Sequence, residues 1–362
     1  MRILHIASIK NSSFSGVCVA VPAHIISQQS VEDVALLNIT NDRIDGIDHQ
    51  FVYNGSNWMT SVSTDFASPD IVIFHEVFYI EFPFIAKKIR ENKIPYIIIP
   101  HGCLVTSALH HKWLKKKIAG LLIFNKFINS ASAIQCLSEN EKHNTFFKPD
   151  KFIGTNGINT PSEIKTNFRK QNIQITYIGR LDIKIKGLDL LLAAINSLRS
   201  ILLEKNVLIN IYGPDVSGSY KTLENIIKVN DISNIVKLHP GISGEAKKKV
   251  LLDSDLFIQV SRHEGMPMGI LEALSYGLPC IITNGTALDS IVAKYDAGWV
   301  AKTNADSIKT CLLDALSMHD RYNYKSANAI TLINENFSWS KISCLAIQQY
   351  RSIVDKFYKK TN

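Results

Sequence analysis

The sequence lacks the features of an exported or membrane-spanning protein. The apolar stretch from Met1 to Ser8 is interrupted by His5 and followed by the polar residues 10–13, a pattern unlike a signal peptide. No window approaches the roughly 20 apolar residues that a membrane-spanning helix needs. We therefore expect a cytoplasmic protein that is not integral to a membrane, and a basic segment discussed below favours the inner face of the cell membrane.

Motifs of several other protein classes are also absent. The six cysteines are scattered without a C-x-x-C pair, so we expect reduced thiols. The sequence has no zinc-finger spacing and no RNP-like aromatic strand, so we expect no nucleic-acid partner. It also lacks a P-loop and a G-x-G-x-x-G dinucleotide fingerprint. The net charge of +8 instead suits an anionic substrate or an anionic membrane surface.

The apolar residues indicate two α/β domains. The 362 residues are 46% hydrophobic and 20% charged, which is typical of a soluble chain with room for two cores. Continuous apolar runs alternate with helix-length segments, as in parallel sheets that are covered on both faces. We expect domains at 1–160 and 173–338, joined by the polar segment 160–172. The expected strands are 3–7, 34–39, 71–74, 96–99, 133–137 and 152–154, then 173–178, 207–212, 235–238, 256–260, 280–283 and 298–300.

The most informative segment is bounded by Glu264 and Glu272. It follows an apolar strand and opens a helix, and Gly265 and Gly269 let the backbone approach a ligand closely. Pro267 suits the first helical turn, whose free N–H groups can bind an anion or sugar hydroxyls. Carboxylates on either side of these amides fit a nucleotide sugar. The alternative is an ordinary strand-to-helix turn with a surface glutamate.

A second segment places cations where a diphosphate would bind. Arg180 follows a strand that ends at Gly179, and Lys186 precedes a helix that begins near Gly187. A guanidinium fork and an ammonium beside a helix start form a clamp for phosphate groups. Two solvated loop charges are the alternative, and Lys184 is near enough to replace Lys186.

Together these segments resemble the C-terminal domain of retaining glycosyltransferases of family 4, which have the GT-B fold. The resemblance covers the chain, is strongest over 173–290 and is weaker in the first half. It implies two doubly wound Rossmann-like domains facing a central cleft, with the closing helix 339–362 packing back toward the first domain. The matching pieces are Gly179-Arg180, Lys186-Gly187, Tyr212-Gly213-Pro214, Leu238 to Gly241, Ser261 to Ala273 and Phe337-Ser338-Trp339.

The resemblance also implies roles for single residues. Arg180 and Lys186 would bind the donor diphosphate, Glu264 sugar hydroxyls and Glu272 the ribose. His101, which follows a strand and precedes a glycine, resembles the family's histidine near the reacting sugar, although a lone histidine is often structural. Further donor contacts are implied for Gly16, Gly213, Pro240, Gly241, Ile242, Gly265, Met266, Pro267, Met268 and Gly269. The Arg180 to Lys186 spacing is one residue longer than usual, and Met266 to Met268 replace a frequent Phe-Gly pair.

The implied activity is a glycosyltransferase that moves a sugar, with retention, from a nucleotide diphosphate donor to a glycan or lipid-linked acceptor. Bacterial surface polysaccharide synthesis is the implied setting, with no cofactor besides the donor. No metal is expected. The pair Asp253 and Asp255 resembles a D-x-D metal motif, but it begins a strand, away from the expected cleft, and Arg180 and Lys186 already supply positive charge.

A basic amphipathic segment lies in the first half. In Lys112–Phe124 the apolar residues fall on one helical side and Lys112, Lys115 and Lys116 elsewhere. Such a helix can lie on an anionic bilayer, and a core-packed helix with a solvated lysine face is the alternative.

Two other functions stay open. A non-hydrolysing nucleotide-sugar epimerase shares the fold but needs acid and base groups at the sugar ring, for which the sequence offers no convincing set. A two-lobed sugar-binding protein would normally carry a signal peptide and would not need a diphosphate clamp.

Overall fold

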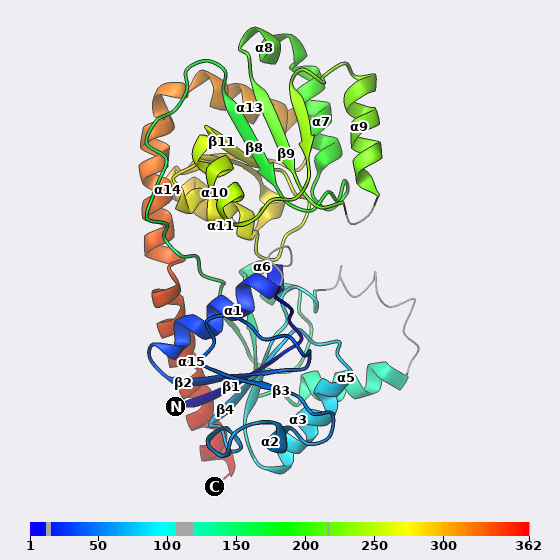
Figure 1. Ribbon diagram of the computed structural model, residues 1–362, viewed down its shortest axis with the longest axis vertical. Helices are drawn as coiled ribbons and strands as arrows, with labels where there is room; N and C mark the ends of the chain where they lie inside the picture. Colours follow the sequence, from blue (N-terminus) through cyan, green and yellow to red (C-terminus); the bar gives the residue numbers. More distant parts are fainter. Residues whose placement is uncertain (12–15, 106–118, 216–217, 362) are drawn as a thin grey trace. The chain divides into compact units, whose positions relative to one another are not determined.

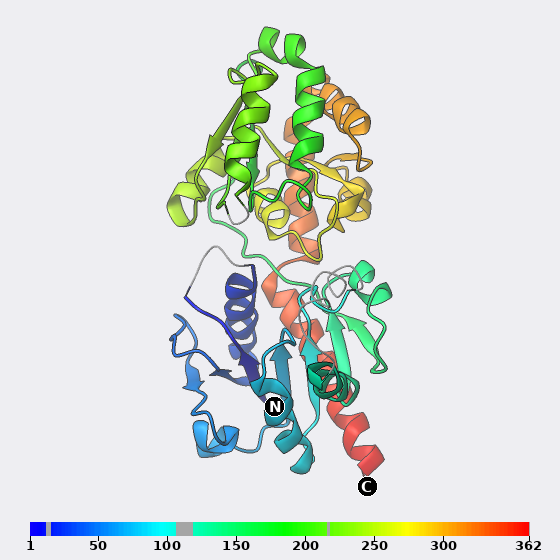
Figure 2. The same ribbon diagram turned by 90° about the vertical axis from the view of Figure 1, so that its right-hand side faces the viewer.

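The computed structural model describes residues 1–11, 16–105, 119–215 and 218–361 (Figures 1 and 2). The chain divides into two compact units. Unit 1 contains Met1–Gly157 together with Trp339–Asn362, and unit 2 contains Ile158–Ser338. Each unit has one parallel sheet with helices on both faces, so the predicted doubly wound α/β architecture is confirmed.

The sheet of unit 1 has seven strands in the order β3-β2-β1-β4-β5-β6-β7. Six of them were predicted, and the edge strand β3 was not. Its residues, His49 to Val52, are exposed or half-buried and form no continuous apolar run, because an edge strand need not be buried on both faces. The strands are β1 Arg2–Ala7, β2 Asp33–Asn38, β3 His49–Val52, β4 Ile71–His75, β5 Tyr96–Ile99, β6 Ala133–Cys136 and β7 Lys151–Ile153.

Helices cover both faces of this sheet. Leu4 and Ile6 of β1 point to the face that packs on α3 and α5, and His5 points to the opposite face, where α1 and α15 contact each other (Figure 1). The closing helix α15 is therefore part of unit 1. The described helices of unit 1 are α1 Gly16–Gln29, α2 Trp58–Ser61, α3 Glu81–Glu91, α5 Ala119–Asn129, α6 Glu139–His143 and α15 Trp339–Thr361.

The sheet of unit 2 has six strands in the order β10-β9-β8-β11-β12-β13, all of them predicted. They are β8 Gln174–Ile178, β9 Leu208–Tyr212, β10 Val236–His239, β11 Leu256–Gln259, β12 Cys280–Thr283 and β13 Gly298–Ala301. One face packs on α7, α9 and α13, and the other on α11, α12 and α14. The helices are α7 Leu188–Ser197, α8 Arg199–Glu204, α9 Ser219–Val229, α10 Gly244–Asp253, α11 Met268–Ser275, α12 Asp289–Tyr295, α13 Ala305–Ser317 and α14 Tyr322–Asn336.

The segment 160–172, expected to join the domains, belongs to unit 2. Lys165 is buried and lies 3.4 Å from the carboxylate of Asp255, and the backbone N–H of Lys165 donates to the carbonyl of Tyr276. The compact unit therefore begins at Ile158, earlier than the expected residue 173. Within the described ranges, no helix has the length and apolar character that crossing a membrane requires.

Candidate functional site

The predicted donor-binding residues of unit 2 gather at one edge of its sheet, the edge formed by the carboxyl ends of the strands. Arg180 follows β8, Gly213 follows β9, the loop 240–242 follows β10 and Glu264 follows β11. Strands β8 and β11 are neighbours although four described helices and two strands separate them in sequence, so the strand order reverses between them. Ligands of open parallel sheets bind at such a reversal, outside the carboxyl ends of the strands.

Lys186 and Glu264 form an ion pair at this edge. Both side chains are nearly buried, at 11% and 13% exposure. Glu264 Oε1 also accepts hydrogen bonds from Gln259 Nε2 at 2.8 Å and from Ser261 Oγ at 2.7 Å. Three donors therefore fix this carboxylate, and Oε2 accepts no hydrogen bond from the part of the chain that the structure describes. A sugar hydroxyl can donate to that oxygen.

Arg180 and Lys184 differ from Lys186 in their surroundings. The Arg180 side chain is exposed and forms no ion pair with any described residue, so its guanidinium is available to an anion. Lys184 is 83% exposed and lies 3.5 Å from Asp189, which Arg262 also holds through two hydrogen bonds of 2.7 and 2.9 Å. The geometry therefore favours Lys186 over Lys184 as the second cation.

Glycines are required where the backbones of this edge meet. A Cβ on Gly213 would lie 1.9 Å from the carbonyl oxygen of Gly179, and one on Gly187 would lie 2.1 Å from that of Val260. Gly187 also has a positive φ of 67°, which favours glycine. Gly213, predicted as a donor contact, thus has a structural role in bringing β8 and β9 together.

The helix α11 begins at Met268, with Pro267 as the residue before it rather than in its first turn. A Cβ on Gly269 would lie 3.1 Å from the carbonyl oxygen of Ile178, so the helix start packs tightly against the end of β8. No described side chain caps this helix N-terminus. Met266 and Met268 pack on the core of unit 2, and Gly265 stands between Glu264 and this turn.

Glu272 lies in the second turn of α11 and forms an ion pair with Lys247 of α10. Both side chains keep about a quarter of their surface, at 25% and 23% exposure, so a ligand can still reach the carboxylate. The loop 240–242 lies between β10 and α10 and is partly or fully exposed. At its start, the rings of Tyr212 and His239 are stacked with centroids 4.3 Å apart.

Asp253 and Asp255 lie at the opposite end of β11 and serve the structure of unit 2. Arg169 forms ion pairs with both carboxylates, and Lys165 pairs with Asp255. The buried Asp255 also accepts hydrogen bonds from the backbone N–H groups of Arg169 and Gln174, at 3.0 and 2.9 Å. This pair therefore anchors the segment 160–172 to the sheet.

In unit 1, the turn after β5 holds His101. His101 and Gly102 both have positive φ values, 49° and 82°, which is a strained backbone for histidine. The buried Glu141 stabilises the turn, because its Oε1 accepts from the N–H of Gly102 and its Oε2 from that of Leu137, each at 2.6 Å. His101 Nε2 lies 3.0 Å from Nδ1 of the buried His75. Burial lowers the pKa of His101 to about 3, so the ring is neutral.

The same edge of unit 1 contains a pocket of about 430 Å³. Glu76, directly after β4, adopts a positive φ of 66° and accepts a 2.5 Å hydrogen bond from the Tyr79 hydroxyl. Such strain in a non-glycine residue is typical of binding sites. The lining residues are Ser8, Lys10, Val17, Cys18, Thr40, Glu76 and Tyr79.

The remaining predictions for unit 1 concern Gly16 and the basic segment Lys112–Phe124. Gly16 is the first residue of α1, and no atom of the described residues lies within 4 Å of a Cβ placed there. Most of the basic segment Lys112–Phe124 lies outside the described residues. At its end, the described Leu122 is 70% exposed.

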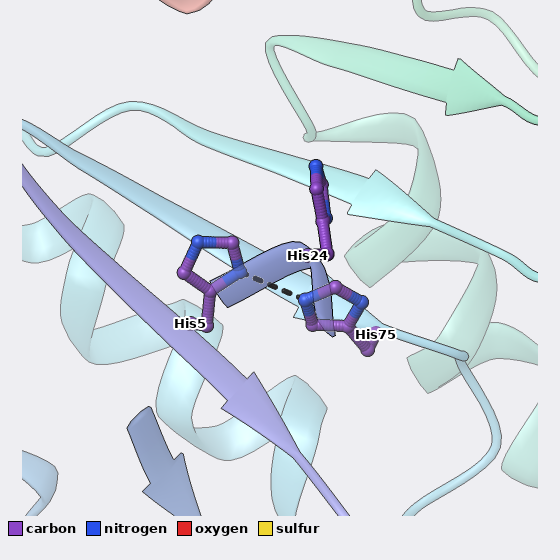
Figure 3. Close-up of side chains that lie close together, drawn as sticks. All are labelled: His5, His24 and His75. Carbon is purple, nitrogen blue, oxygen red and sulfur yellow. Dashed lines mark hydrogen bonds between the residues drawn. The ribbon is translucent and has the colours of Figure 1, made fainter. Parts of the chain in front are cut away.

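Sequence reasoning missed several residues of these sites. Lys247 is one of three lysines in a row, and only the fold shows that it pairs with Glu272. Glu76 and Lys10 each follow a strand, and this position could have marked them as candidate binding residues. The buried His5, His24 and His75 come from separate elements, so their proximity left no local pattern in the sequence (Figure 3).

Comparison with known proteins identifies the second unit. Residues 160–331 match the family "Glycosyl transferases group 1". An uncharacterized glycosyltransferase of Methanocaldococcus jannaschii is 27% identical over 201 residues, 54% of this chain and 50% of that protein. The Escherichia coli UDP-Gal:alpha-D-GlcNAc-diphosphoundecaprenol alpha-1,3-galactosyltransferase is 34% identical over 97 residues, 25% of this chain and 21% of that enzyme. The chain thus spans half or less of these relatives.

A solved structure matches both units. HepE of Anabaena, crystallised with UDP, superposes with a TM-score of 0.77 at 14% identity, over 97% of this chain and 100% of that one. At that identity the likeness establishes the fold. Residues 160–331 therefore match the glycosyl transferases group 1 family, and the chain as a whole has the two-domain GT-B fold.

Proposed function

We propose that the protein is a retaining glycosyltransferase that uses a nucleotide diphosphate sugar. The proposal rests on the carboxyl-end edge of the sheet in unit 2. There Lys186, Glu264 and the exposed Arg180 gather where the strand order reverses between β8 and β11. Cations there suit the diphosphate, and the free oxygen of Glu264 suits a sugar hydroxyl. The UDP in the structural neighbour from Anabaena is consistent with such a donor.

The chemistry needs charge and position rather than a side-chain nucleophile. As the bond between sugar and diphosphate breaks, negative charge develops on the leaving phosphate, and Arg180 and Lys186 stabilise it. A phosphate oxygen of the donor takes the proton of the attacking acceptor hydroxyl, so the sugar is delivered to the face it left. Glu264 orients the sugar, and Glu272 holds the ribose. No metal or cofactor takes part in this scheme.

We place the acceptor at the pocket of unit 1. Glu76 offers a carboxylate to acceptor hydroxyls, and Lys10 offers a cation to an anionic group such as the phosphate of a lipid-linked saccharide. The E. coli relative acts on a diphosphoundecaprenol-linked sugar, which supports an acceptor of this class. Bacterial surface polysaccharide synthesis is the corresponding setting.

A lipid-linked acceptor would be met at a membrane surface. The segment Lys112–Phe124 carries lysines beside an apolar side, and the exposed Leu122 continues it. We propose that this segment docks on the anionic inner face of the cell membrane from the cytoplasm.

The test is a thermal-shift screen with UDP-, GDP- and ADP-sugars, followed by product analysis. A donor at 100 times its dissociation constant raises the stability of the folded protein by about 2.7 kcal/mol. Transfer releases nucleoside diphosphate and glycosylates the acceptor. An isomerised nucleotide sugar would show an epimerase instead, and stabilisation by free sugars alone would show a sugar-binding protein.

A further inference from the structure

A continuous path of hydrogen bonds crosses the buried face of unit 1 and ends at His101. His5 of β1, His24 of α1 and His75 of β4 lie close together on the buried face of the sheet (Figure 3). His5 Nδ1 lies 2.8 Å from His75 Nε2, and His75 Nδ1 lies 3.0 Å from His101 Nε2. Gln28 joins the path, with Oε1 3.1 Å from His5 Nε2 and Nε2 2.9 Å from His24 Nε2.

A second ordered set of hydrogen bonds lies within unit 1, at Gln135 and Tyr350. The backbone carbonyl of Gly154 can only accept, so Gln135 Nε2 donates to it at 2.9 Å and Gln135 Oε1 faces Tyr350. The Tyr350 hydroxyl donates to that oxygen at 2.7 Å. A Cβ on Gly154 would lie 2.5 Å from Gln135 Nε2, so glycine is needed for this contact.

Gln28 sets the direction of the hydrogen bonds at the histidines. Its amide NH₂ can only donate, and one hydrogen of this group goes to His24 Nε2. Gln28 Oε1 is left as an acceptor, and it faces His5 Nε2.

Each ring in turn has only one available tautomer. His5 donates from Nε2 to Gln28, so its Nδ1 carries a lone pair and accepts from His75 Nε2. His75 Nδ1 is then an acceptor, and His101 Nε2 donates to it. His101 Nδ1 therefore carries a lone pair, and no described residue donates a hydrogen bond to it.

We propose that Gln28, His5 and His75 are positioning residues that hold His101 in its Nε2–H tautomer and present its Nδ1 lone pair to a hydroxyl of a saccharide substrate. The identity of that hydroxyl rests on the proposed glycosyl transfer, whereas the tautomer rests on the contacts alone. Because the path contains only neutral groups, it fixes orientation without placing a charge beside the sugar.

Burial keeps every ring of the path neutral. It lowers the pKa of His5 to about 3 and that of His24 to about 4, and it lowers the pKa of His75 well below 6.5. Among the described residues, the titratable groups that act on these rings are the other histidines of the path, from β1, α1, β4 and the turn after β5. Protonation of one ring would break the donor and acceptor order of the rest.

A metal site made of His5, His24 and His75 is the competing use of this cluster. Their ligand atoms lie within 4.8 Å of one another. Both nitrogens of His5 and of His75 are already engaged in hydrogen bonds, however, and no carboxylate is among the described groups of the cluster. A divalent ion would break the path and bury an uncompensated charge, so the geometry favours the hydrogen-bonded path.

The direct test is nitrogen NMR of imidazole-labelled full-length protein, in which protonated and unprotonated ring nitrogens give separate signals. We expect His101 to carry its proton on Nε2 and His5 likewise. A proton on Nδ1 of His101, or one equivalent of zinc bound to these histidines after incubation with Zn²⁺, would overturn the proposal. This measurement needs no substrate, so its result is independent of whether the protein transfers sugar.

Variants of His75 connect the tautomer to catalysis. Glutamine can both donate to His5 and accept from His101, whereas leucine can do neither. We expect H75L to lose the single His101 tautomer and to lower kcat about tenfold with an unchanged KM for donor, and H75Q to retain both. Equal losses in the two variants would contradict the positioning role. H49Q, at an exposed histidine of β3, is the matched control and should behave as wild type.

Discussion

The two units present different chemistry at the same edge of similar parallel sheets. In unit 2 the edge is ionic, with the nearly buried pair Lys186–Glu264 and the partly exposed pair Lys247–Glu272. In unit 1 the corresponding edge combines the charged pocket residues Glu76 and Lys10 with a neutral part, where His101 ends a path of uncharged rings. The difference suits a division of work in which unit 2 stabilises developing charge and unit 1 orients hydroxyl groups.

Residues of the ion pairs in unit 2 can act in stability as well as in the proposed catalysis. Removing one partner of a buried ion pair leaves an uncompensated charge, at a cost of about 3–5 kcal/mol. Lys186 therefore has a role in stability as well as in the proposed catalysis, whereas the exposed Arg180 has only the second. This contrast separates two residues that the sequence presented as equivalent.

The largest expected effect is on Arg180 and Lys186. R180A should lower turnover by about 100- to 1000-fold, because loss of a transition-state charge donor costs about 2.7–4 kcal/mol, and should leave thermal stability unchanged. K186A should lower both turnover and thermal stability. Steady-state kinetics and calorimetric unfolding measure the two quantities. K184A is the matched control, since the exposed Lys184 ammonium pairs only with Asp189 among described residues, and it should retain activity.

Acid should weaken unit 1 through its histidines. The folded-state pKa of His5 and of His101 is about 3, below the ordinary 6.5, so the unfolded chain binds more protons between these values. Stability is complete above about pH 6.5 and falls as the pH drops through that window, by about 1.4 kcal/mol per histidine and pH unit. Urea unfolding at pH 7.5 and 5.5 measures this, and H24Q should reduce the slope. A flat profile would contradict the neutral path.

Glu272 tests ground-state binding in unit 2. E272Q should raise the KM for donor about tenfold with little change in kcat, because contacts to the ribose are the same before and during reaction. Kinetics at varied donor concentration separate these constants. An unchanged KM would remove Glu272 from the donor site and leave its pair with Lys247 as a structural contact.

The basic segment of unit 1 should bind anionic vesicles at low salt. Each lysine near the surface contributes on the order of 1 kcal/mol, and salt screens this attraction within about 8–10 Å. Charge reversal at Lys115, Lys116 and Lys117 should abolish vesicle sedimentation and spare transfer to a soluble acceptor. If wild-type protein stays in the supernatant, the segment does not dock on membranes.

Chelation should have the smallest effect, since Arg180 and Lys186 supply the positive charge. Activity in excess EDTA should equal that in buffer. Asp253 and Asp255 are held by Arg169 and should affect stability rather than turnover. Activity that EDTA removes and Mg²⁺ or Mn²⁺ restores would reject the metal-independent scheme.

The sequence predicted most of the fold because buried parallel strands are continuous apolar runs. Only the edge strand β3, with polar His49 and Gln50, escaped this signal. The donor edge of unit 2 was also predictable, because each residue of it directly follows a strand or precedes a helix. Arg180 and Lys186 were identified in this way, and the structure adds that only Lys186 is paired with Glu264.

The interior of unit 1 was not predictable in the same way. His5 lies within an apolar run, His24 within a helix and His75 at a strand end, and nothing in each local pattern indicates the others. Their contacts depend on the pairing of β1 with β4 and on the position of α1. The conformation of His101 likewise depends on Glu141, which is 40 residues further along the chain.

The central claim is that the edge of unit 2 binds the diphosphate of a nucleotide sugar. Isothermal titration calorimetry of the full chain with UDP, GDP and ADP tests it most directly, with wild type, R180A and K184A compared in the presence of EDTA. The account predicts that one of these nucleotides binds wild type and K184A at one site, and binds R180A at least about tenfold more weakly. Equal affinity of all three proteins, or no binding of any nucleoside diphosphate, would contradict it.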